Sequence, residues 1–356
     1  MSALVSSIEP TNLARREGKP LISLNRIAFV LALAIVYVVV PLIGNDYWLN
    51  SLVIPTLVMG LAGVGLNLLT GYAGLVSLGS AAFMSIGAFS AYNLLLRAPF
   101  LPLPIALIVA GFIAAAAGVV FGLPSLRIKG FYLSASTLGA QFFFEWLFTN
   151  FHWFSHDSMS LTISAPRLAF AGHDLSSPAG RYLLVVVTTG LLLWLARNIV
   201  NSRIGRDWMA IRDMDTAAAV AGIPTASRKL LAYGVSSFFC GVAGALWAFA
   251  YLGTADAHAF DLDKSFQVLF IVIIGGSASL FGNFLGAAFI VLTPILLDLI
   301  VLWWNLTDYV DQGSLTNVLR ILFGSIIILL LIKEPDGLAS LIGRLARRFA
   351  AWPLRI

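Results

Sequence analysis

Long apolar runs separated by short polar loops make up most of this chain. Most of the runs approach the roughly 20 apolar residues that an α-helix needs to cross a bilayer. They are continuously apolar, whereas the strands of a membrane barrel alternate polar and apolar residues, so the pattern predicts helices. The sequence therefore predicts an all-α integral membrane protein with about ten transmembrane helices. The runs cover residues 27–43, 50–69, 74–96, 103–123, 131–150, 181–198, 229–252, 266–281, 284–304 and 315–332.

The run at 266–281 fits a complete crossing least well. It is short, and it contains Gly275 and Gly276. Both a full crossing and a re-entrant pair of short helices are compatible with its length. A re-entrant pair would change the number of spans but would leave both ends of the chain on the same side.

Basic residues are unevenly divided among the loops, and this predicts the orientation of the chain. Cytoplasmic loops carry an excess of lysine and arginine. Here the basic residues gather in the two tails and in alternate loops, whereas aspartates prevail in the loops between them. An even number of crossings satisfies this division and places both the N-terminus and the C-terminus inside. We expect a cytoplasmic tail at 1–26, a transmembrane domain at 27–333, an outer loop at 151–180, an inner loop at 199–228 and a basic cytoplasmic tail at 334–356.

The composition agrees with this interpretation and removes several others. Hydrophobic residues make up 59% of the chain, charged residues only 11%, and the mean hydropathy is +0.92. Soluble domains contain about 25% charged residues, so lipid must cover much of this surface. The formal net charge of +5 arises in the inner loops and tails, so no nucleic-acid partner is expected. The single cysteine, Cys240, rules out a disulfide within the chain and a multi-cysteine metal site.

The inner loop is longer than a connection between two spans needs to be. Its sequence predicts a short helix that is capped by Gly222 and stopped by Pro224. Two interpretations stay open: a surface on which another protein docks, and an interfacial helix on anionic lipid that is anchored by Trp208 and the arginines. The small and charged residues behind the docking interpretation are Arg206, Arg212, Asp213, Asp215, Ala217, Ala218 and Ala219.

Polar residues inside the predicted spans are candidates for a translocation pathway, because such residues are costly in lipid. Glycine and serine are dense over 71–90, where they allow either close helix packing or a broken helix that lines a cavity. Gln141 and Glu145 are four residues apart and share a helix face. The pathway candidates are Asn67, Ser77, Ser80, Gln141 and Glu145, and further polar residues within the runs are Asn93, Gln267 and Asp298.

Motifs of enzymes and of nucleotide-binding proteins are missing from the sequence. The chain contains no G-x-x-x-x-G-K-[ST] phosphate loop and no H-E-x-x-H zinc motif. No serine, histidine and acidic set can be placed at one membrane depth. We therefore expect no enzymatic activity, no cofactor and no metal site in this chain. Transport driven by ATP would require a separate ATPase subunit.

The inner loop and three further stretches carry a family resemblance. Thr216-Ala217-Ala218, followed after three residues by Gly222, is similar to the EAA-type loop of ABC importer permeases, with Thr216 in place of the usual acidic residue and Asp215 just before it. Residues 65–92, 122–139 and 274–291 strongly resemble the branched-chain amino acid permease family, in its LivM branch. Departures from that family occur at Ser80, where it often has histidine, at Phe131, where an acidic residue is common, and in the outer loop, which lacks a Gly-Gly-Pro-Asn-Gly stretch.

This resemblance implies an ABC importer permease fold and a set of partners. In that family the loop forms a coupling helix that sits in a cleft of the ATP-binding subunit. The resemblance therefore implies that coupling to the ATPase subunit depends on Arg206, Arg212, Asp213, Asp215, Thr216, Ala217, Ala218 and Gly222. The implied partners are ATP-binding cassette subunits that hold ATP and Mg, a second permease in a homodimer or heterodimer, a periplasmic solute-binding protein, and the lipid of the bacterial inner membrane.

Two questions stay open at this point. The solute can be a branched-chain amino acid, urea, an amide or an aromatic acid, because branches of the family carry each of these. The alternative function is a secondary transporter driven by an ion gradient. That class usually buries a coupling carboxylate in mid-membrane, and Asp298 is the residue in this chain that fits such a role.

Overall fold

The computed structural model describes residues 46–98, 100–126, 131–154, 163–164, 169–170, 173–174 and 177–303, with short pieces between 317 and 340. The chain divides into two compact units, Met1–Ile43 and Gly44–Ile356. The described residues all belong to the second unit. The predicted N-terminal tail, the run at 27–43, and most of the run at 315–332 and of the C-terminal tail lie outside them.

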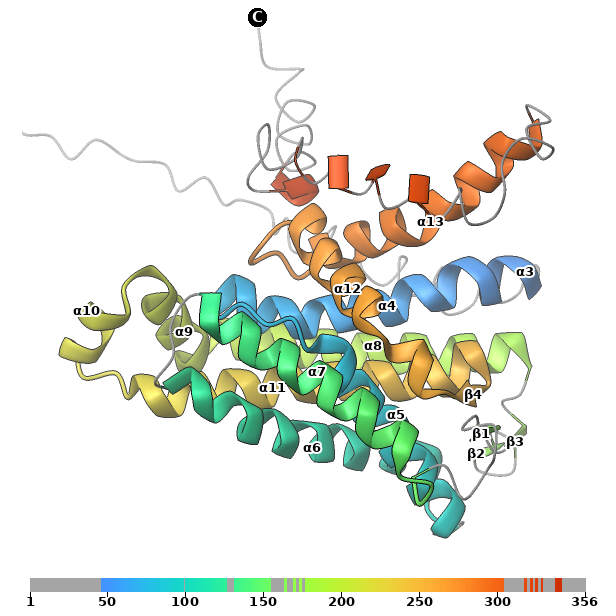
Figure 1. The fold of residues 1–356 in the computed structure, drawn as a ribbon, viewed down its shortest axis with the longest axis horizontal. Helices are drawn as coiled ribbons and strands as arrows, with labels where there is room; N and C mark the ends of the chain where they lie inside the picture. Colours follow the sequence, from blue (N-terminus) through green and yellow to red (C-terminus); the bar gives the residue numbers. More distant parts are fainter. Residues whose placement is uncertain are drawn as a thin grey trace, which may run out of the picture. The chain divides into compact units, whose positions relative to one another are not determined.

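The described part of the second unit is predominantly helical (Figure 1). Short π-helical turns extend two of the helices without a break, so Asp46–Tyr72 and Thr225–Leu252 are each one continuous helical segment. In chain order the elements are α3 (Asp46–Trp48), η2 (Leu49–Val53), α4 (Ile54–Asn67), η3 (Leu68–Tyr72), α5 (Ser80–Arg97), α6 (Leu103–Gly122), η4 (Leu123–Leu126), α7 (Phe131–Asn150), β1 (Ile163–Ser164), β2 (Ala169–Phe170), β3 (His173–Asp174), α8 (Pro178–Asn201), α9 (Arg203–Asp213), α10 (Asp215–Val220), α11 (Thr225–Leu246), η5 (Trp247–Leu252), β4 (Thr254–Ala255), η6 (Ala257–Phe260), α12 (Leu262–Gly275) and α13 (Gly282–Trp303).

Four of the described helical segments are long and apolar enough to cross a membrane. They are Asp46–Tyr72, Leu103–Gly122, Pro178–Asn201 and Thr225–Leu252. Each coincides with one of the predicted runs, so the prediction of an all-α membrane protein is confirmed for these segments. The total of about ten crossings and the orientation of the chain stay predictions.

Helix α11 is the centre of the bundle, where it packs most extensively against α6, α5 and α4. Small residues make this possible: a Cβ atom added to Gly87 of α5 would meet the carbonyl of Gly241, and one added to Gly244 would meet the carbonyl of Met84. The backbones of α5 and α11 are therefore in direct contact, as is common between membrane helices, whose association depends on close packing.

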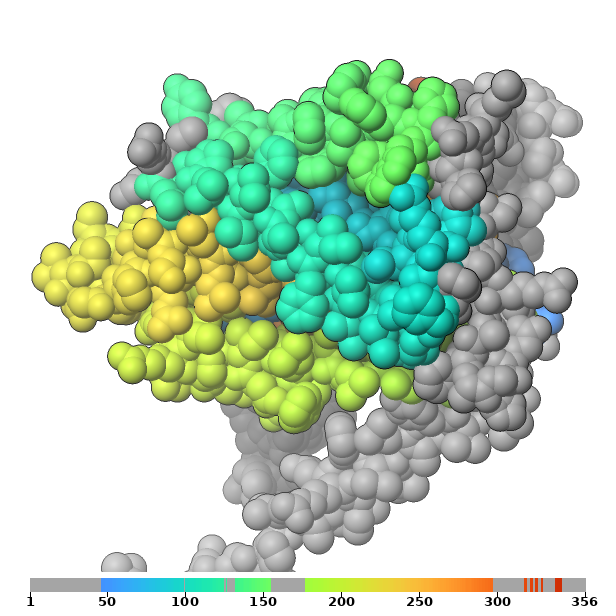
Figure 2. Space-filling model, turned by 90° about the horizontal axis from the view of Figure 1, so that it is seen from below, coloured from blue at the N-terminus to red at the C-terminus, as the bar shows by residue number. Residues whose placement is uncertain are grey.

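One face of the bundle carries an apolar groove of about 600 Å³ between α6, α8 and α11. Figure 2 shows the three helices on this face, with α11 between α6 and α8. Phe112 on α6 and Trp194 on α8 are more than half exposed. Large apolar side chains exposed over a continuous surface are expected where lipid replaces water as the solvent.

The run predicted at 266–281 is not one helix. Helix α12 contains 14 residues and ends at Gly275, so it is about 21 Å long, shorter than the roughly 30 Å hydrocarbon core. Gly276 has a φ of 110°, and the chain turns over 276–281 before α13 begins at Gly282 and packs back against α12. This run is therefore a short helix followed by a turn, and whether it crosses the membrane stays a prediction.

The helix predicted from residue 74 onward begins only at Ser80, so the first part of that prediction is wrong. Residues 73–79 form a non-helical segment that connects η3 to α5 (Figure 1), and its residues alternate between buried positions and the exposed Gly74 and Val76. Two of its backbone N–H groups make hydrogen bonds that do not belong to a helical ladder. Leu78 N donates to Thr137 Oγ1 (2.9 Å), and Leu75 N donates to Leu69 O (3.0 Å). The glycine-rich and serine-rich stretch thus contains a broken helix, one of its two predicted uses.

Candidate functional site

The inner loop folds into two helices rather than the one expected. The side chain of Ser202 caps α9 by accepting a hydrogen bond from Ile204 N (3.1 Å). Met214 has an extended backbone conformation and separates α9 from α10. After α10, Gly222 adopts a φ of 84° and Ile223 N donates to Ala218 O (3.0 Å), which is the Schellman arrangement. The predicted capping role of Gly222 is confirmed.

Trp208 fastens α9 to the bundle. Its side chain is fully buried, and its Nε1 donates to the carbonyl oxygen of Arg228 at 2.9 Å. Beside it, Asp207 Oδ2 pairs with Arg228 Nε at 2.8 Å. Trp208 therefore does not lie against lipid, and the hypothesis that it anchors an interfacial helix is wrong.

The three alanines of α10 do not form one docking face. Ala218 is only 4% exposed, because it lies on the side of α10 that faces the rest of the chain, whereas Ala217 and Ala219 are exposed. Two apolar residues that the sequence analysis did not select are more prominent: Val220 is 90% and Met214 61% exposed. We call Met214, Ala217, Val220, Ala221 and Gly222 the α10 cap. Each is exposed and small or apolar.

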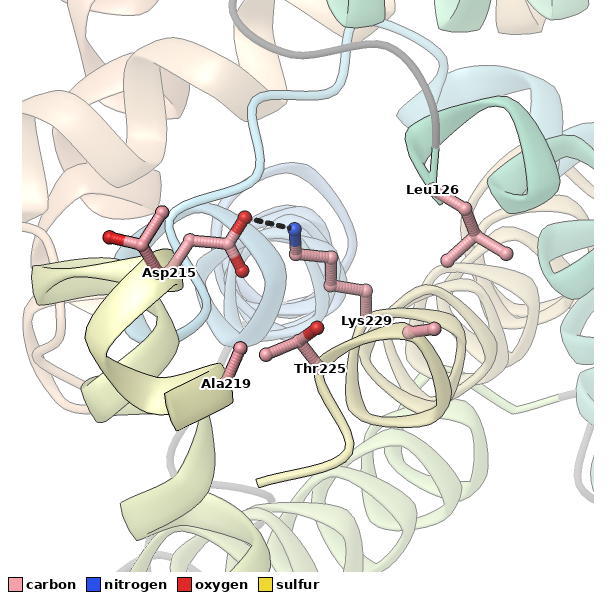
Figure 3. Close-up of a pocket in the computed structure, with 7 residues that line it drawn as sticks. Leu126, Asp215, Ala219, Thr225 and Lys229 are labelled. Carbon is pink, nitrogen blue, oxygen red and sulfur yellow. Dashed lines mark hydrogen bonds and ion pairs between the residues drawn. The ribbon is translucent and has the colours of Figure 1, made fainter. Parts of the chain in front are cut away.

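An ion pair holds α10 against the start of α11. Lys229 Nζ lies 2.8 Å from Asp215 Oδ2, and the lysine side chain is only 9% exposed (Figure 3). The pair borders a pocket of about 270 Å³ whose other lining residues are Leu126, Thr216, Ala219, Thr225 and Ala226. Asp215 thus uses its charge within the chain, and Thr216 is exposed beside it. Lys229 is not among the residues predicted from the sequence, which gives no sign that its partner is Asp215, 14 residues away.

We expect Lys229→Met to loosen α10 while leaving the helices of the bundle in place. Methionine keeps most of the buried volume but removes the cation opposite Asp215, at a cost of about 1–3 kcal/mol in local stability. Hydrogen exchange over residues 214–224 should accelerate by about tenfold or more. Lys229→Arg, which keeps the charge, is the matched control. Equal exchange in wild type and Lys229→Met would contradict the fastening role of the pair.

Arg212 reaches back to the bundle, although its side chain is still 37% exposed. Its Nη1 donates to the carbonyl oxygen of Gly71 at 2.9 Å, and its Nε and Nη2 both donate to Asp213 Oδ1 at 3.0 Å. The stem of Arg212 also lies against Gly74, whose φ is 70°. Arg206 is exposed too, but it donates to the carbonyl oxygen of Asn201 at the end of α8. The two arginines predicted to surround one docking surface are therefore bonded to different parts of the bundle.

Asn67 connects the two helix breaks described above, the segment 73–79 and the turn 276–281. It is fully buried, and its Nδ2 donates to Ser279 O (3.1 Å), to Asn283 Oδ1 (3.2 Å) and, more weakly, to Gly276 O (3.4 Å). Its Oδ1 accepts from Ala278 N at 2.9 Å. These contacts span more than 200 residues of sequence, so the end of the α4–η3 helix and the 276–281 turn form one buried polar cluster.

Three of the pathway candidates gather at the start of α5. Ser77 and Ser80 are buried on either side of Gly79. Gln141 of α7 is buried too; its Nε2 donates to Phe260 O (2.7 Å), and its Oε1 accepts from Ser265 Oγ (3.0 Å). Ser265 in turn accepts from Ala81 N (2.9 Å), so it connects Gln141 to the first turn of α5. Ser265 and Thr137 complete this polar cluster, and neither was among the predicted residues.

Glu145 and Gln267 lie away from that cluster. Glu145 is one turn beyond Gln141 on α7 and half-buried. Gln267 borders a cavity of about 570 Å³ between α4, η5, α12 and α13, where its Oε1 accepts from Lys264 Nζ (3.2 Å). That ammonium group also lies 4.3 Å from the centre of the Trp247 ring. The side chain of Asp298 falls outside the described residues.

The described residues thus form a helical bundle with membrane-capable segments, buried helix breaks and a helical loop at one end. The sequence profile described as branched-chain amino acid transport system / permease component matches residues 48–331. The chain belongs to this family, as its motifs suggested. It is a transport subunit and not an enzyme.

Individual relatives agree with this assignment. The high-affinity branched-chain amino acid transport system permease protein LivM of Escherichia coli (strain K12) is 28% identical over 306 residues, which are 80% of this chain and 68% of the relative. The same protein of Salmonella typhimurium matches to the same extent. The autoinducer 2 import system permease protein LsrC of Enterobacter sp. (strain 638) is 27% identical over 225 residues, 61% of this chain and 62% of the relative. No solved structure matches the chain significantly.

Proposed function

We propose that this chain is the permease subunit of an ABC importer. It forms part of the pathway by which a small polar solute crosses the bacterial inner membrane. A separate ATPase subunit drives transport by docking on the α10 cap. The observation that carries this proposal is the exposure of Met214 and Val220 on a helix whose other side is fixed to the bundle. An exposed apolar patch on a firmly held element is a feature of protein docking sites.

The solute proposed is a branched-chain amino acid. The names of the LivM relatives and of the family support this choice, whereas LsrC is named for a different compound. The polar cluster of Ser77, Ser80 and Gln141 is proposed to border the pathway, together with Asn67 and, nearer one end, Glu145. Broken helices inside a membrane protein expose backbone dipoles that bind polar solutes.

The remaining parts of the importer are proposed on the same basis. A second permease, identical or different, completes the pore, a periplasmic binding protein delivers the solute, and ATP with Mg binds to the ATPase subunits. In this arrangement α9 and α10 face the cytoplasm, as do both ends of the chain, because the basic residues concentrate there. An ion-gradient-driven transporter with Asp298 as its coupling residue is the alternative that the following experiment tests.

We expect Val220→Asp to abolish co-purification of the ATPase subunits with this permease. The substitution places a charge at the centre of an apolar contact, where it must lose its water without gaining a partner. The measurement is the amount of ATPase retained with the affinity-tagged permease after co-expression of the importer subunits. A loss of about tenfold or more is expected, equivalent to roughly 1.4 kcal/mol of binding energy.

Asn201→Asp is the matched control, because it adds the same charge at an exposed position at the end of α8, outside the cap and away from the Asp215–Lys229 pair. It should retain the ATPase at the wild-type level. If the wild-type permease retains no ATPase, the importer function is refuted and the gradient-driven alternative gains support. If Val220→Asp retains it fully, the α10 cap is not the docking surface.

A further inference from the structure

Arg212 lies where the docking helices meet the interior of the bundle. It is the last but one residue of α9, and its guanidinium group donates to the carbonyl oxygen of Gly71 at the end of the α4–η3 helix. A Cβ atom on Gly74 would lie only 2.8 Å from Arg212 Cγ, so the stem of the arginine fills the space beside the first residues of the 73–79 break. Arg212 therefore connects α9 directly to the entry to that break.

The first break is locked to the second by short contacts. The hydroxyl of Tyr72 donates to the carbonyl oxygen of Ala278 at 2.6 Å, and Ala278 N donates to Asn67 Oδ1 at 2.9 Å. A Cβ atom on Gly71 would lie 2.5 Å from Ala278 N, which shows that the two backbones touch. The residue that receives the hydrogen bond of Arg212 is therefore packed against the 276–281 turn.

Ala278 is held in an unfavourable backbone conformation. Its φ is 61°, which makes it the one residue other than glycine with a positive φ in the described part of the chain. A residue in this region persists only when its surroundings hold it there. Asn67 and Tyr72 hold Ala278 from both its N–H and its carbonyl. If these two contacts shift, the turn between α12 and α13 can relax into another conformation.

We propose that Arg212 is a positioning residue that transmits movement of α9 and α10 to the paired breaks, 73–79 and 276–281, and that these two breaks change conformation together during transport. This inference rests on the proposed importer function and adds to it the element that ATP-driven movement acts on. It also separates Arg212 from the docking surface, since its guanidinium group is already bonded within the chain. Coupling between distant sites requires an element with two arrangements that both sites influence, and the inference assigns this part to the strained turn at Ala278.

The test uses the complete importer reconstituted in proteoliposomes, with the binding protein and a solute that the wild type transports. Solute taken up and ATP hydrolysed are measured together. We expect Arg212→Ala to lower the number of solute molecules transported per ATP by about tenfold while the permease still retains its ATPase subunits. Tyr72→Phe should lower the same ratio in the same direction, because it removes one of the two contacts that hold Ala278.

Arg203→Ala is the matched control, because Arg203 is an exposed arginine on the same helix. It should leave the ratio at the wild-type value. An unchanged ratio in Arg212→Ala overturns the inference, and so does a loss of the ATPase from Arg212→Ala, which would make this residue part of the docking surface. Should Arg212→Ala fail to fold, Tyr72→Phe decides: a lowered ratio supports the inference and a wild-type ratio overturns it. Failure of the proposed function is a different result, in which the wild-type permease retains no ATPase.

Discussion

Gly87→Val is expected to prevent α5 from packing against α11 and to cost at least about 3 kcal/mol of stability. The valine side chain would overlap the carbonyl group of Gly241, which is backbone and cannot move to another rotamer. Gly244 meets the carbonyl of Met84 in the same interface, so α5 cannot shift along α11 to make room. The thermal unfolding temperature of the purified protein in detergent measures the effect, and most of the variant should elute as aggregate.

Gly139→Val provides the control for this substitution. Gly139 lies within helix α7, as Gly87 lies within α5, but no atom of the described residues comes within 4 Å of a Cβ built on it. The two substitutions have the same effect on helix propensity, so the difference between them isolates the contact between backbones. Equal unfolding temperatures for the two variants would contradict the packing of α5 on α11.

Asn67→Leu is expected to cost roughly 3–5 kcal/mol, because it leaves several buried polar groups without their partner at once. Ala278 N, Ser279 O and the side chain of Asn283 each lose a hydrogen bond to Asn67. Water cannot replace the amide readily, because Asn67 is fully buried. We expect a large fall in the unfolding temperature and, in the fraction that folds, loss of the defined turn at 276–281, measured by hydrogen exchange.

The comparison variant for this prediction is Asn93→Leu. Asn93 is also an asparagine within a span, but its Nδ2 donates to Phe89 O in its own helix and to Phe154 O, which lies just after the end of α7. Its removal frees fewer groups at a less buried site, so its effect should be smaller by about half or more. A larger effect for Asn93→Leu would show that the cluster around Asn67 does not hold the two breaks together.

Several features of this protein could be predicted from its sequence because they depend on local composition. The apolar runs at 50–69, 103–123, 181–198 and 229–252 correspond to membrane-capable helices. A segment that enters lipid must satisfy its own backbone hydrogen bonds, so length and hydropathy are enough to predict a helix. Gly222 and Pro224 predicted the end of the loop helix for an equally local reason, the left-handed conformation that glycine accepts.

The family was also predictable, since motifs of 18 to 28 residues, such as 65–92 and 274–291, carry enough information to be recognised without coordinates. Those same motifs contain the two helix breaks. What the sequence left open was whether their glycines and serines serve close packing or interrupt a helix. The interruption at 73–79 depends on Thr137, and the start of α5 on Ser265, both far away in sequence.

The tertiary structure alone decided the roles of the loop residues. Ala218 is buried while Ala217 and Val220 are exposed, because α10 turns that side toward the start of α11. Arg212 and Asp215 resemble surface charges in the sequence, but their partners, Gly71 and Lys229, are brought to them by the packing of separate helices. The packing of the helices decides whether two residues far apart along the chain form a hydrogen bond or an ion pair. The sequence around each residue does not show this, because its local pattern of polar and apolar residues is the same with or without the partner.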